Sequence, residues 1–182
     1  MMNDYRLLPY TAIDGIPTFK DSFIKGIFER MEREHLIGQV FSDGSVTTPD
    51  DFLRIMKFGQ NSLYVIFIDK DVAGLCWLNG FEKRKADFHF CFFDNLRGET
   101  AVKVGRQVVI ELLNMENVNG DPIFDVLVGM VSEKNIAALR WCEKMQFGTL
   151  GVLPAGMWDD AEKRSVSGHV FYAERSTYGK GQ

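Results

Sequence analysis

Cysteine and histidine are both scarce in this sequence, with three of each among 182 residues. The cysteines, Cys76, Cys91 and Cys142, lie far apart and form neither a CxxC pair nor a Cys/His cluster. An odd number of isolated thiols in apolar stretches predicts buried free cysteines in a reducing compartment, not a disulfide framework. No metal-ligand spacing can be recognised either, so no metal site is expected.

Long apolar runs and a strong excess of charge are also missing. No stretch of 18 apolar residues is present, and Met1–Tyr10 lacks the apolar core of a signal peptide. The formal net charge of −4 argues against a nucleic-acid-binding surface as the main role. These absences predict a cytoplasmic protein that has neither a membrane nor a nucleic acid as its partner.

Apolar material, by contrast, is plentiful. Hydrophobic residues make up 46% of the chain and include 15 phenylalanines, which excludes wholesale disorder. The length suits one domain with its own core. We expect a single domain over residues 1–182, with residues 175–182 as a flexible tail.

Hydrophobic periodicity predicts an α/β fold. The expected strands are Arg6–Tyr10, Leu63–Ile68, Val72–Leu78, Ala86–Phe93, Phe124–Val131, Gly148–Pro154 and His169–Ala173. The expected helices are Phe19–Ile37, which starts near Pro17, then Asp50–Phe58, Ala101–Glu116 and Ser132–Met145, and Ala155–Gly168 is expected to be a polar loop. An antiparallel meander followed by a strand–helix–strand–helix unit predicts a mixed sheet, with Phe124–Val131 beside a parallel neighbour.

The turn between Ala86–Phe93 and the next helix is the strongest local signal. It contains Gly98 and opens a long amphipathic helix. The first N–H groups of a helix have no intrahelical acceptor, and the helix dipole favours negative charge there. This turn is therefore expected to bind an anion, for which a pyrophosphate is the usual occupant.

At this turn the sequence resembles the GNAT family of acetyl-CoA-dependent N-acetyltransferases. In that family the corresponding strand ends in a turn of the form Gln/Arg-x-x-Gly-x-Gly/Ala, which Arg97–Val102 matches at Arg97. Thr100 stands where Gly is usual and Val102 where Gly or Ala is usual. Gly98 fits a further glycine position that is often found there.

A second segment, Asn135–Phe147, strengthens the resemblance. In that family the fifth strand is followed by Asn, small and apolar residues, a Tyr and then Glu-Lys-x-Gly-Phe. The matching residues of this chain, in the same order, are Asn135, Ala137, Ala138, Glu143, Lys144 and Phe147. It departs at Cys142, where the Tyr is often found, and at Gln146, where Gly is usual. The family's Tyr often protonates the leaving CoA thiolate, so that step would need another donor here.

The resemblance implies a mixed, mostly antiparallel sheet of six to seven strands flanked by helices, and acetyl-CoA as co-substrate. Backbone N–H groups of the turn would hold the CoA pyrophosphate, and the end of the preceding strand would pair with the pantetheine arm like an added strand. Asn135 would bond the pantetheine or cap its own helix. The residues implied to bind acetyl-CoA are Phe92, Phe93, Arg97, Gly98, Glu99, Thr100, Ala101, Val102 and Asn135.

Acetyl transfer to an amine also needs a base that titrates near neutral pH. His89 suits this role by type and position, since its reference pKa is about 6.5; the alternative is a histidine bonded to a neighbour on the sheet. Asp87 shares its face and could orient it. For the acid, Cys142 is the candidate by position, with a packed thiol as the alternative and Tyr172 or a solvent proton as further choices.

Three functional hypotheses follow. The first is an N-acetyltransferase that moves an acetyl group from acetyl-CoA to a primary amine of a small molecule or peptide by direct attack in a ternary complex. The second is a non-catalytic GNAT-fold module that senses CoA or binds a protein, suggested by Thr100, Cys142 and Gln146. The third is another nucleotide-binding α/β domain that uses the Gly98 turn. Family members often pair, so a homodimer is considered, and the acceptor is left open.

Overall fold

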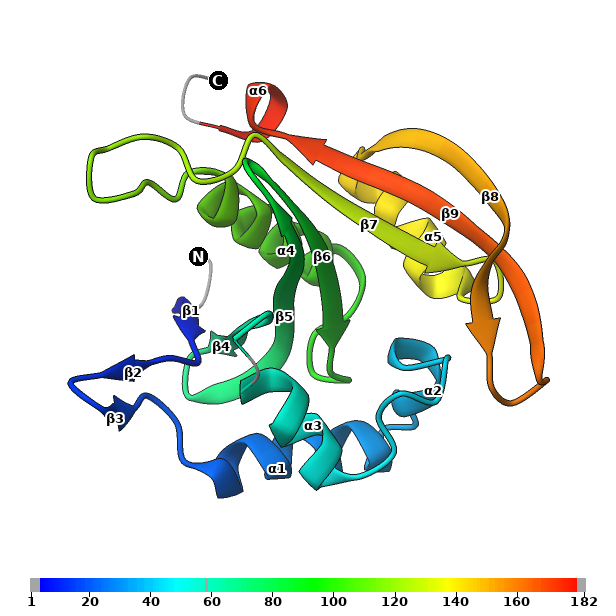
Figure 1. Cartoon of the computed structure of the whole chain (residues 1–182), viewed down its shortest axis with the longest axis horizontal. Coiled ribbons are helices and arrows are strands. Elements are labelled where there is room, and N and C mark those ends of the chain that lie inside the picture. The colour runs from blue at the N-terminus through cyan, green and yellow to red at the C-terminus, as the bar shows by residue number, and fades with distance from the viewer. Residues whose placement is uncertain (1–3, 58, 180–182) are drawn as a thin grey trace. The chain divides into compact units, whose positions relative to one another are not determined.

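A computed structural model describes residues 4–57 and 59–179 of the chain. Within these residues seven strands form one sheet in the order β1-β4-β5-β6-β7-β9-β8, and β2 and β3 form a separate hairpin (Figure 1). The strands of the sheet are β1 (Tyr5–Pro9), β4 (Ser62–Ile68), β5 (Asp71–Glu82), β6 (Lys85–Phe92), β7 (Val126–Ser132), β8 (Gly148–Asp159) and β9 (Arg164–Glu174). The helices are α1 (Asp21–Arg33), α2 (Ile37–Val40), α3 (Pro49–Lys57), α4 (Gly98–Leu113), α5 (Ile136–Met145) and α6 (Arg175–Tyr178).

Strand pairing confirms the predicted mixed, mostly antiparallel sheet. Strand β4 pairs antiparallel with β1 and β5, and β7 pairs antiparallel with β9. Strand β7 is parallel to β6, with Lys85 opposite Val126 and Asp87 opposite Val128. This confirms the parallel neighbour that the nearly continuous apolar run of β7 predicted.

The chain divides into two compact units, of which the first comprises Met1–Asn79, His89–Arg97 and Asp159–Lys163. In this unit α1 and α3 lie side by side (Figure 1). The apolar face of α1 buries Ile24, Ile27, Phe28 and Met31 in a core that also contains Phe52 and Phe93. Thr48 caps α3, because its hydroxyl accepts the Asp51 N–H at 3.1 Å.

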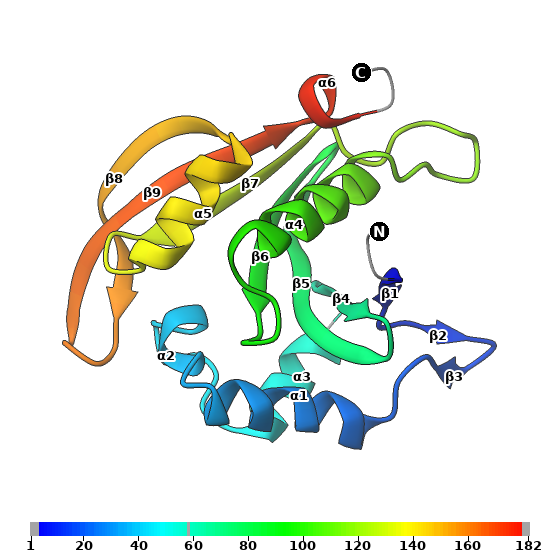
Figure 2. The ribbon, with the colours of Figure 1, turned by 180° about the vertical axis from the view of Figure 1, so that it is seen from behind.

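The second unit comprises Gly80–Phe88, Gly98–Trp158 and Arg164–Gln182. Helices α4 and α5 lie on the same side of its strands (Figure 2). The 16-residue α4 buries the stripe that its periodicity predicted, which includes Val104, Val108 and Leu112. The Phe147 ring packs edge-on against Phe88 of β6 and against Trp141 of α5.

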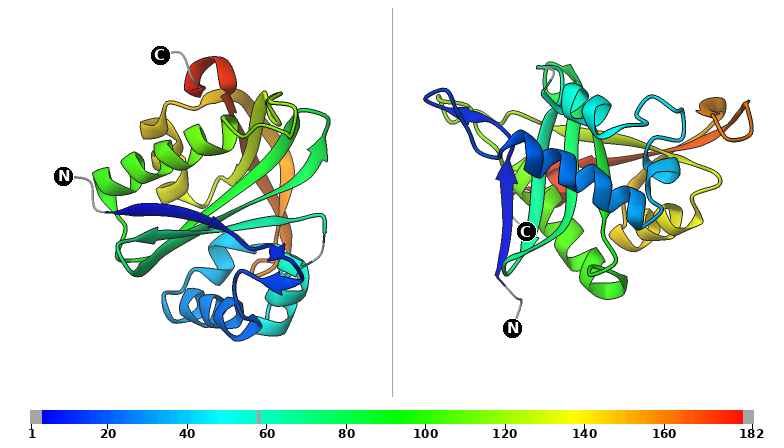
Figure 3. Two further views of the ribbon diagram at one scale, coloured as in Figure 1. Left: turned by 90° about the vertical axis from the view of Figure 1, so that its left-hand side faces the viewer. Right: turned by 90° about the horizontal axis from the view of Figure 1, so that it is seen from below.

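Several predicted boundaries were wrong, and tertiary pairing explains most of the differences. Pro17 does not start a helix; with Ile16 it forms β3, which pairs with β2 (Ala12–Ile13) in a hairpin that projects from the first unit (Figure 3). Ala155–Gly168 was expected to be a loop, but most of it belongs to the long strands β8 and β9. A polar strand exposed to solvent lacks the alternating apolar pattern on which the prediction relied.

The helix ends differ as well. Helix α4 begins at Gly98, three residues before its predicted start, and α5 begins at Ile136, after a turn. Arg175–Tyr178, the start of the expected tail, forms α6, and Tyr178 is buried with its hydroxyl donating to the Met145 carbonyl at 2.6 Å. Phe58, the expected end of a helix, and residues 180–182 of the tail lie outside the described residues.

Candidate active site

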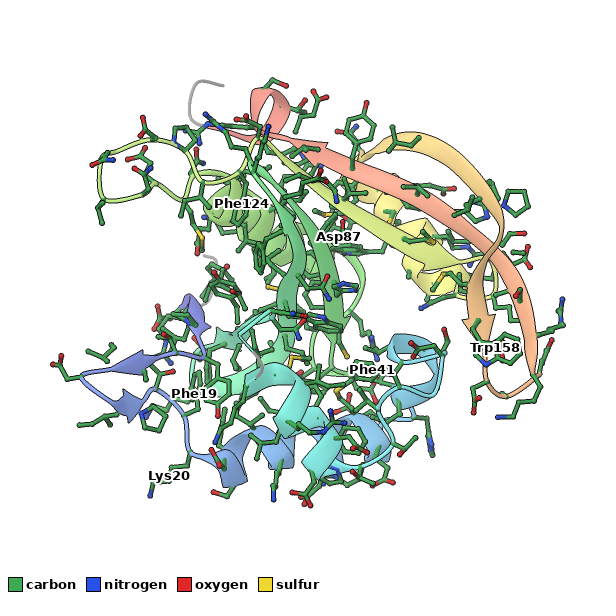
Figure 4. All side chains as sticks on the ribbon, viewed as in Figure 1. Phe19, Lys20, Phe41, Asp87, Phe124 and Trp158 are labelled. Atoms are coloured by element: carbon green, nitrogen blue, oxygen red, sulfur yellow. The ribbon has the colours of Figure 1, made fainter. Side chains whose placement is uncertain are left out.

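His89 lies on β6 in the first unit and is half-buried. Its ring stacks on the buried Trp77 with 4.7 Å between the ring centroids, and Trp77 in turn stacks on Phe41. Phe41 follows α2 (Figure 4). The His89 Nε2 lies 3.1 Å from the Asn79 Oδ1. Since an amide oxygen only accepts, Nε2 carries the proton in this pair, which leaves Nδ1 as the ring nitrogen with a lone pair.

The family resemblance implied that the backbone at the end of β6 pairs with the pantetheine arm of acetyl-CoA. The Phe93 N–H donates to the Ala73 carbonyl of β5 at 3.0 Å. Because successive residues of a strand direct their backbone groups to opposite edges, the groups of Phe92 point away from β5. The paired register of β6 with β7 covers Lys85–Asp87, so Phe92 lies beyond it.

Arg97, at the start of the predicted pyrophosphate turn, is folded back on this strand end. Its guanidinium donates to the Phe92 carbonyl at 3.1 Å and pairs with the Asp94 carboxylate. The side chain is exposed, so the pair has little effect on stability. Its contribution here is to fix the local conformation between Phe92 and Arg97.

In the second unit, α4 begins at Gly98, in the turn that was predicted to bind an anion. Gly98 has a φ of +63°, a left-handed conformation that favours glycine. Gly98, Glu99 and Thr100 are all exposed to solvent, whereas Ala101 is buried. Helix α4 is held at this end by the Trp141 indole, which donates to the Ala101 carbonyl at 3.3 Å.

Asn135 and Cys142 belong to α5 and its cap. The Asn135 Oδ1 accepts the Ala138 N–H at 3.1 Å, so the side chain caps α5, one of the two roles considered for it. Cys142 is 5% exposed, and burial raises the pKa of its thiol to about 12. Burial and this pKa both weigh against Cys142 as a proton donor. Gln146, where the family usually has Gly, adopts the left-handed conformation at the end of α5 with a φ of +60°.

Other side chains named from the sequence have simpler surroundings. Asp87 pairs with Lys85 at 3.1 Å on β6. Trp158, which belongs to the stretch Ala155–Gly168 that was expected to be a loop, lies on β8 with 44% of its surface exposed (Figure 4). Within residues 4–57 and 59–179, no group of three or more His, Cys, Asp or Glu side chains is arranged to hold a metal ion. Among the helices of the same residues, none has the length and hydropathy needed to span a membrane.

Sequence reasoning missed three residues around this region. Asn79 was not identified as a partner of any other residue, yet it bonds His89 from the neighbouring strand β5. Arg30 and Glu34 were given no role, yet both contact the segment after β6. The spacing of four residues between Arg30 and Glu34 was a visible signal for an ion pair, but its partners across the fold were not.

The strand order, the parallel β6–β7 pair and the long helix between these two strands define the fold of the GNAT acetyltransferases. Comparison with protein-family models finds no match, and neither does comparison with curated proteins. Solved structures do match. A Salmonella typhimurium acetyltransferase that modifies the N-terminal serine of ribosomal protein L7/L12 is 12% identical, with a TM-score of 0.71, over 93% of this chain and 94% of that one.

Two further structures show the same likeness. The spermidine N-acetyltransferase of Vibrio cholerae, in complex with CoA and spermine, is 16% identical with a TM-score of 0.66, over 94% of this chain and 97% of that one. The ribosomal L7/L12 acetyltransferase RimL in complex with CoA is 12% identical with a TM-score of 0.66, over 86% of this chain and 90% of that one. At these identities the likeness establishes the fold.

Proposed function

We propose that this protein is an N-acetyltransferase that moves an acetyl group from acetyl-CoA to a primary amine by direct attack in a ternary complex. The observation that carries the proposal is the GNAT fold together with the exposed turn that leads from β6 through Gly98 into α4. The neighbours named above are acetyltransferases, and two of them were solved with CoA bound.

In this proposal the segment from Phe92 to Val102 binds acetyl-CoA. The backbone of Phe92, which points away from β5, would bond the pantetheine amides, whereas the Phe93 N–H already donates to the Ala73 carbonyl and is removed from the predicted contacts. The N–H groups from Arg97 to Val102 would hold the pyrophosphate, assisted by the dipole of α4. The Asn135 Oδ1 already accepts the Ala138 N–H, so a bond to the pantetheine would use its side-chain N–H groups. We therefore assign it the cap of α5 first.

The chemistry is a nucleophilic addition and elimination at the thioester. His89 takes a proton from the ammonium group of the acceptor on Nδ1, and the neutral amine nitrogen forms a bond to the acetyl carbon. As the carbon–sulfur bond breaks, the nitrogen would lose its remaining extra proton to solvent, which gives the amide and the CoA thiolate. Before the transfer, the bond from Nε2 to Asn79 favours the neutral tautomer with its lone pair on Nδ1.

The proton for the thiolate is assigned to solvent. Transfer from Cys142 would be uphill, because its pKa of about 12 lies above that of an ordinary thiol, about 8.5. The weakly basic thiolate needs no dedicated acid at neutral pH. Cys142 takes the role only if its burial is relieved when the cofactor binds.

The acceptor is proposed to be a small-molecule or peptide amine. The neighbours' names give one example of each, spermine and a protein N-terminus. A cytoplasmic location and a homodimer belong to the same proposal. The buried free thiols of Cys76, Cys91 and Cys142 support the location, and the pairing rests on the family resemblance.

A second candidate function is a non-catalytic module that binds CoA. The burial of Cys142, at the position where the family often has its proton-donating Tyr, favours it. Such a protein would bind acetyl-CoA but acetylate no amine.

Thermal unfolding with acetyl-CoA, CoA, NADH and no ligand tests the first step. Ligand at 100 times its dissociation constant adds about 2.7 kcal/mol, which is roughly 5–10 °C for a chain of this size. We expect this shift with both CoA species and none with NADH; no shift with saturating acetyl-CoA would overturn the proposal. Thiol release with spermidine, spermine and a peptide with N-terminal serine then separates the enzyme from the non-catalytic module.

A further inference from the structure

We propose that Arg30 and Glu34 of α1 are positioning residues that set the conformation of Phe92–Arg97 for acetyl-CoA binding. This inference rests on the proposed function, in which that segment carries the first cofactor contacts. Neither residue is itself one of the assigned cofactor contacts. All the residues that carry the argument belong to the first unit.

Arg30 uses every part of its guanidinium. Its Nε donates to the Glu34 carboxylate at 2.7 Å, one terminal nitrogen to the Val72 carbonyl at 2.6 Å and the other to the Asn95 Oδ1 at 3.1 Å. The same group lies over the Phe93 ring, 4.0 Å from its centroid. Arg30 therefore connects α1, the start of β5 and the segment after β6 at a single point.

Glu34 completes the arrangement with its second oxygen. That oxygen accepts the Asp94 N–H at 2.7 Å, while the first oxygen accepts from Arg30. Asn95 also donates to the Val72 carbonyl at 3.2 Å, so both sides of its amide are used. Three successive residues, Phe93, Asp94 and Asn95, are thus fixed by one ion pair of α1.

These contacts act mainly on the exposed part of the segment. Phe93 and Leu96 are 0% and 1% exposed and are already anchored by burial, whereas Asp94 and Asn95 are exposed. The Arg30–Glu34 pair is itself shielded, with side-chain exposures of 26% and 15%. A loop held in its binding conformation before the ligand arrives loses less entropy on binding, which raises affinity.

The test compares matched substitutions on one helix. Arg30→Lys keeps the charge but has a single nitrogen, which cannot hold Glu34, Val72 and Asn95 together. Arg33→Lys is the same change at an exposed position of α1, and Glu32→Gln is the exposed control for Glu34→Gln. Acetyl-CoA affinity is measured by calorimetry well below the unfolding temperature, so that every variant is fully folded.

We expect Arg30→Lys and Glu34→Gln to weaken acetyl-CoA binding by about 10-fold, while Arg33→Lys and Glu32→Gln retain the wild-type dissociation constant. Met56→Ala removes a buried side chain of α3 and lowers stability but leaves the bonds of Arg30 and Glu34 in place, so its affinity should also stay at the wild-type value. Should Arg30→Lys fail to fold, Asn95→Ala removes the loop side of the same contact and should give the same loss.

The outcomes separate the two proposals. If the wild type binds acetyl-CoA and Arg30→Lys or Asn95→Ala binds equally well, the positioning role is overturned while the proposed function stands. If Met56→Ala loses affinity as much as Arg30→Lys, the effect is one of general stability and the positioning role is again overturned. If the folded wild type does not bind acetyl-CoA, the proposed function fails, and the positioning role fails with it.

Discussion

His89 is the residue on which the proposed chemistry depends most. Trp77 stacks on one face of its ring and Asn79 bonds its Nε2, and both contacts restrict the orientation of the imidazole. A structural histidine would have similar contacts, because a stacked aromatic pair contributes about 0.5–1.5 kcal/mol beyond its buried area. Kinetics, and not geometry, distinguishes the two roles.

Replacing His89 with Ala should lower turnover by about 10²- to 10⁴-fold, because a general base is removed from the transition state. The acetyl-CoA dissociation constant should stay within about twofold of the wild type, since the imidazole touches no proposed cofactor contact. Turnover is measured as thiol release with any panel amine that the wild type acetylates, across pH 5.5–9.

Asn79→Ala is the companion variant, because it keeps the imidazole and removes its partner. It should retain a bell-shaped or sigmoid pH–rate profile with a shifted midpoint. An unchanged pH–rate profile in His89→Ala would remove His89 as the base and leave it a packing role against Trp77.

Two helical glycines, Gly105 and Gly26, differ in whether the surrounding packing leaves room for a larger side chain. A Cβ added at Gly105 of α4 would lie 2.4 Å from the Trp141 ring of α5, and that indole also bonds the Ala101 carbonyl. At Gly26 of α1, an added Cβ meets no atom within 4 Å. The close approach of α4 and α5 therefore requires glycine, whereas α1 does not.

The same substitution should have opposite effects at these two positions. Gly26→Ala should stabilise the protein by about 0.5–1 kcal/mol, through the higher helix propensity of Ala. Gly105→Ala should destabilise it by about 1–3 kcal/mol, because Trp141 has to shift in a packed core. Urea denaturation of both variants measures these changes. Equal stability of the two variants would contradict the prediction, because it would show that Trp141 of α5 can shift without loss of stability.

The stability of the whole molecule against pH depends on its carboxylates. The Lys57 ammonium donates to the Asp21 carboxylate at 2.5 Å, joining α3 to α1. This hydrogen bond lowers the pKa of Asp21 and raises the pKa of Lys57. The contribution of Asp21 is thus present above its unfolded pKa, about 4, and is lost as pH falls through the lower folded value. The contribution of Lys57 is present below about pH 10.4 and is lost as pH rises through its higher folded value.

Asp21→Asn should therefore lower the unfolding temperature at pH 7, and the difference from the wild type should shrink as pH falls from about 4 toward 2. The effect is small, because the pair is exposed to solvent. Glu29→Gln on the exposed face of α1 is the control and should behave as the wild type at every pH. A difference that stays constant from pH 7 to pH 2 would contradict the assignment to ionisation.

Much of the fold was predictable because its signals are local. The stripe of Val104, Val108 and Leu112 predicted α4, and the continuous apolar run ending at Val131 predicted a strand with a parallel partner. Exposed segments carry no such signal, which is why the length of β8 and β9 and the hairpin at Ala12–Pro17 were missed. These segments are strands because they pair with other segments of the chain, and hydrophobic periodicity contains no information on such pairing.

For the candidate site, the residue types and their order could be predicted along the chain: His89 on a strand, Gly98 at a helix start and Asn135 at a helix cap. The partners of these side chains could not be predicted, because they depend on the fold. Asn79 contacts His89 from the neighbouring strand, Arg30 and Glu34 contact Asn95 and Asp94 some sixty residues away in the chain, and Cys142 is buried. Contacts between distant residues, and the burial that sets a thiol's pKa, arise only when the chain has folded, because no local pattern specifies a neighbour that is remote in sequence.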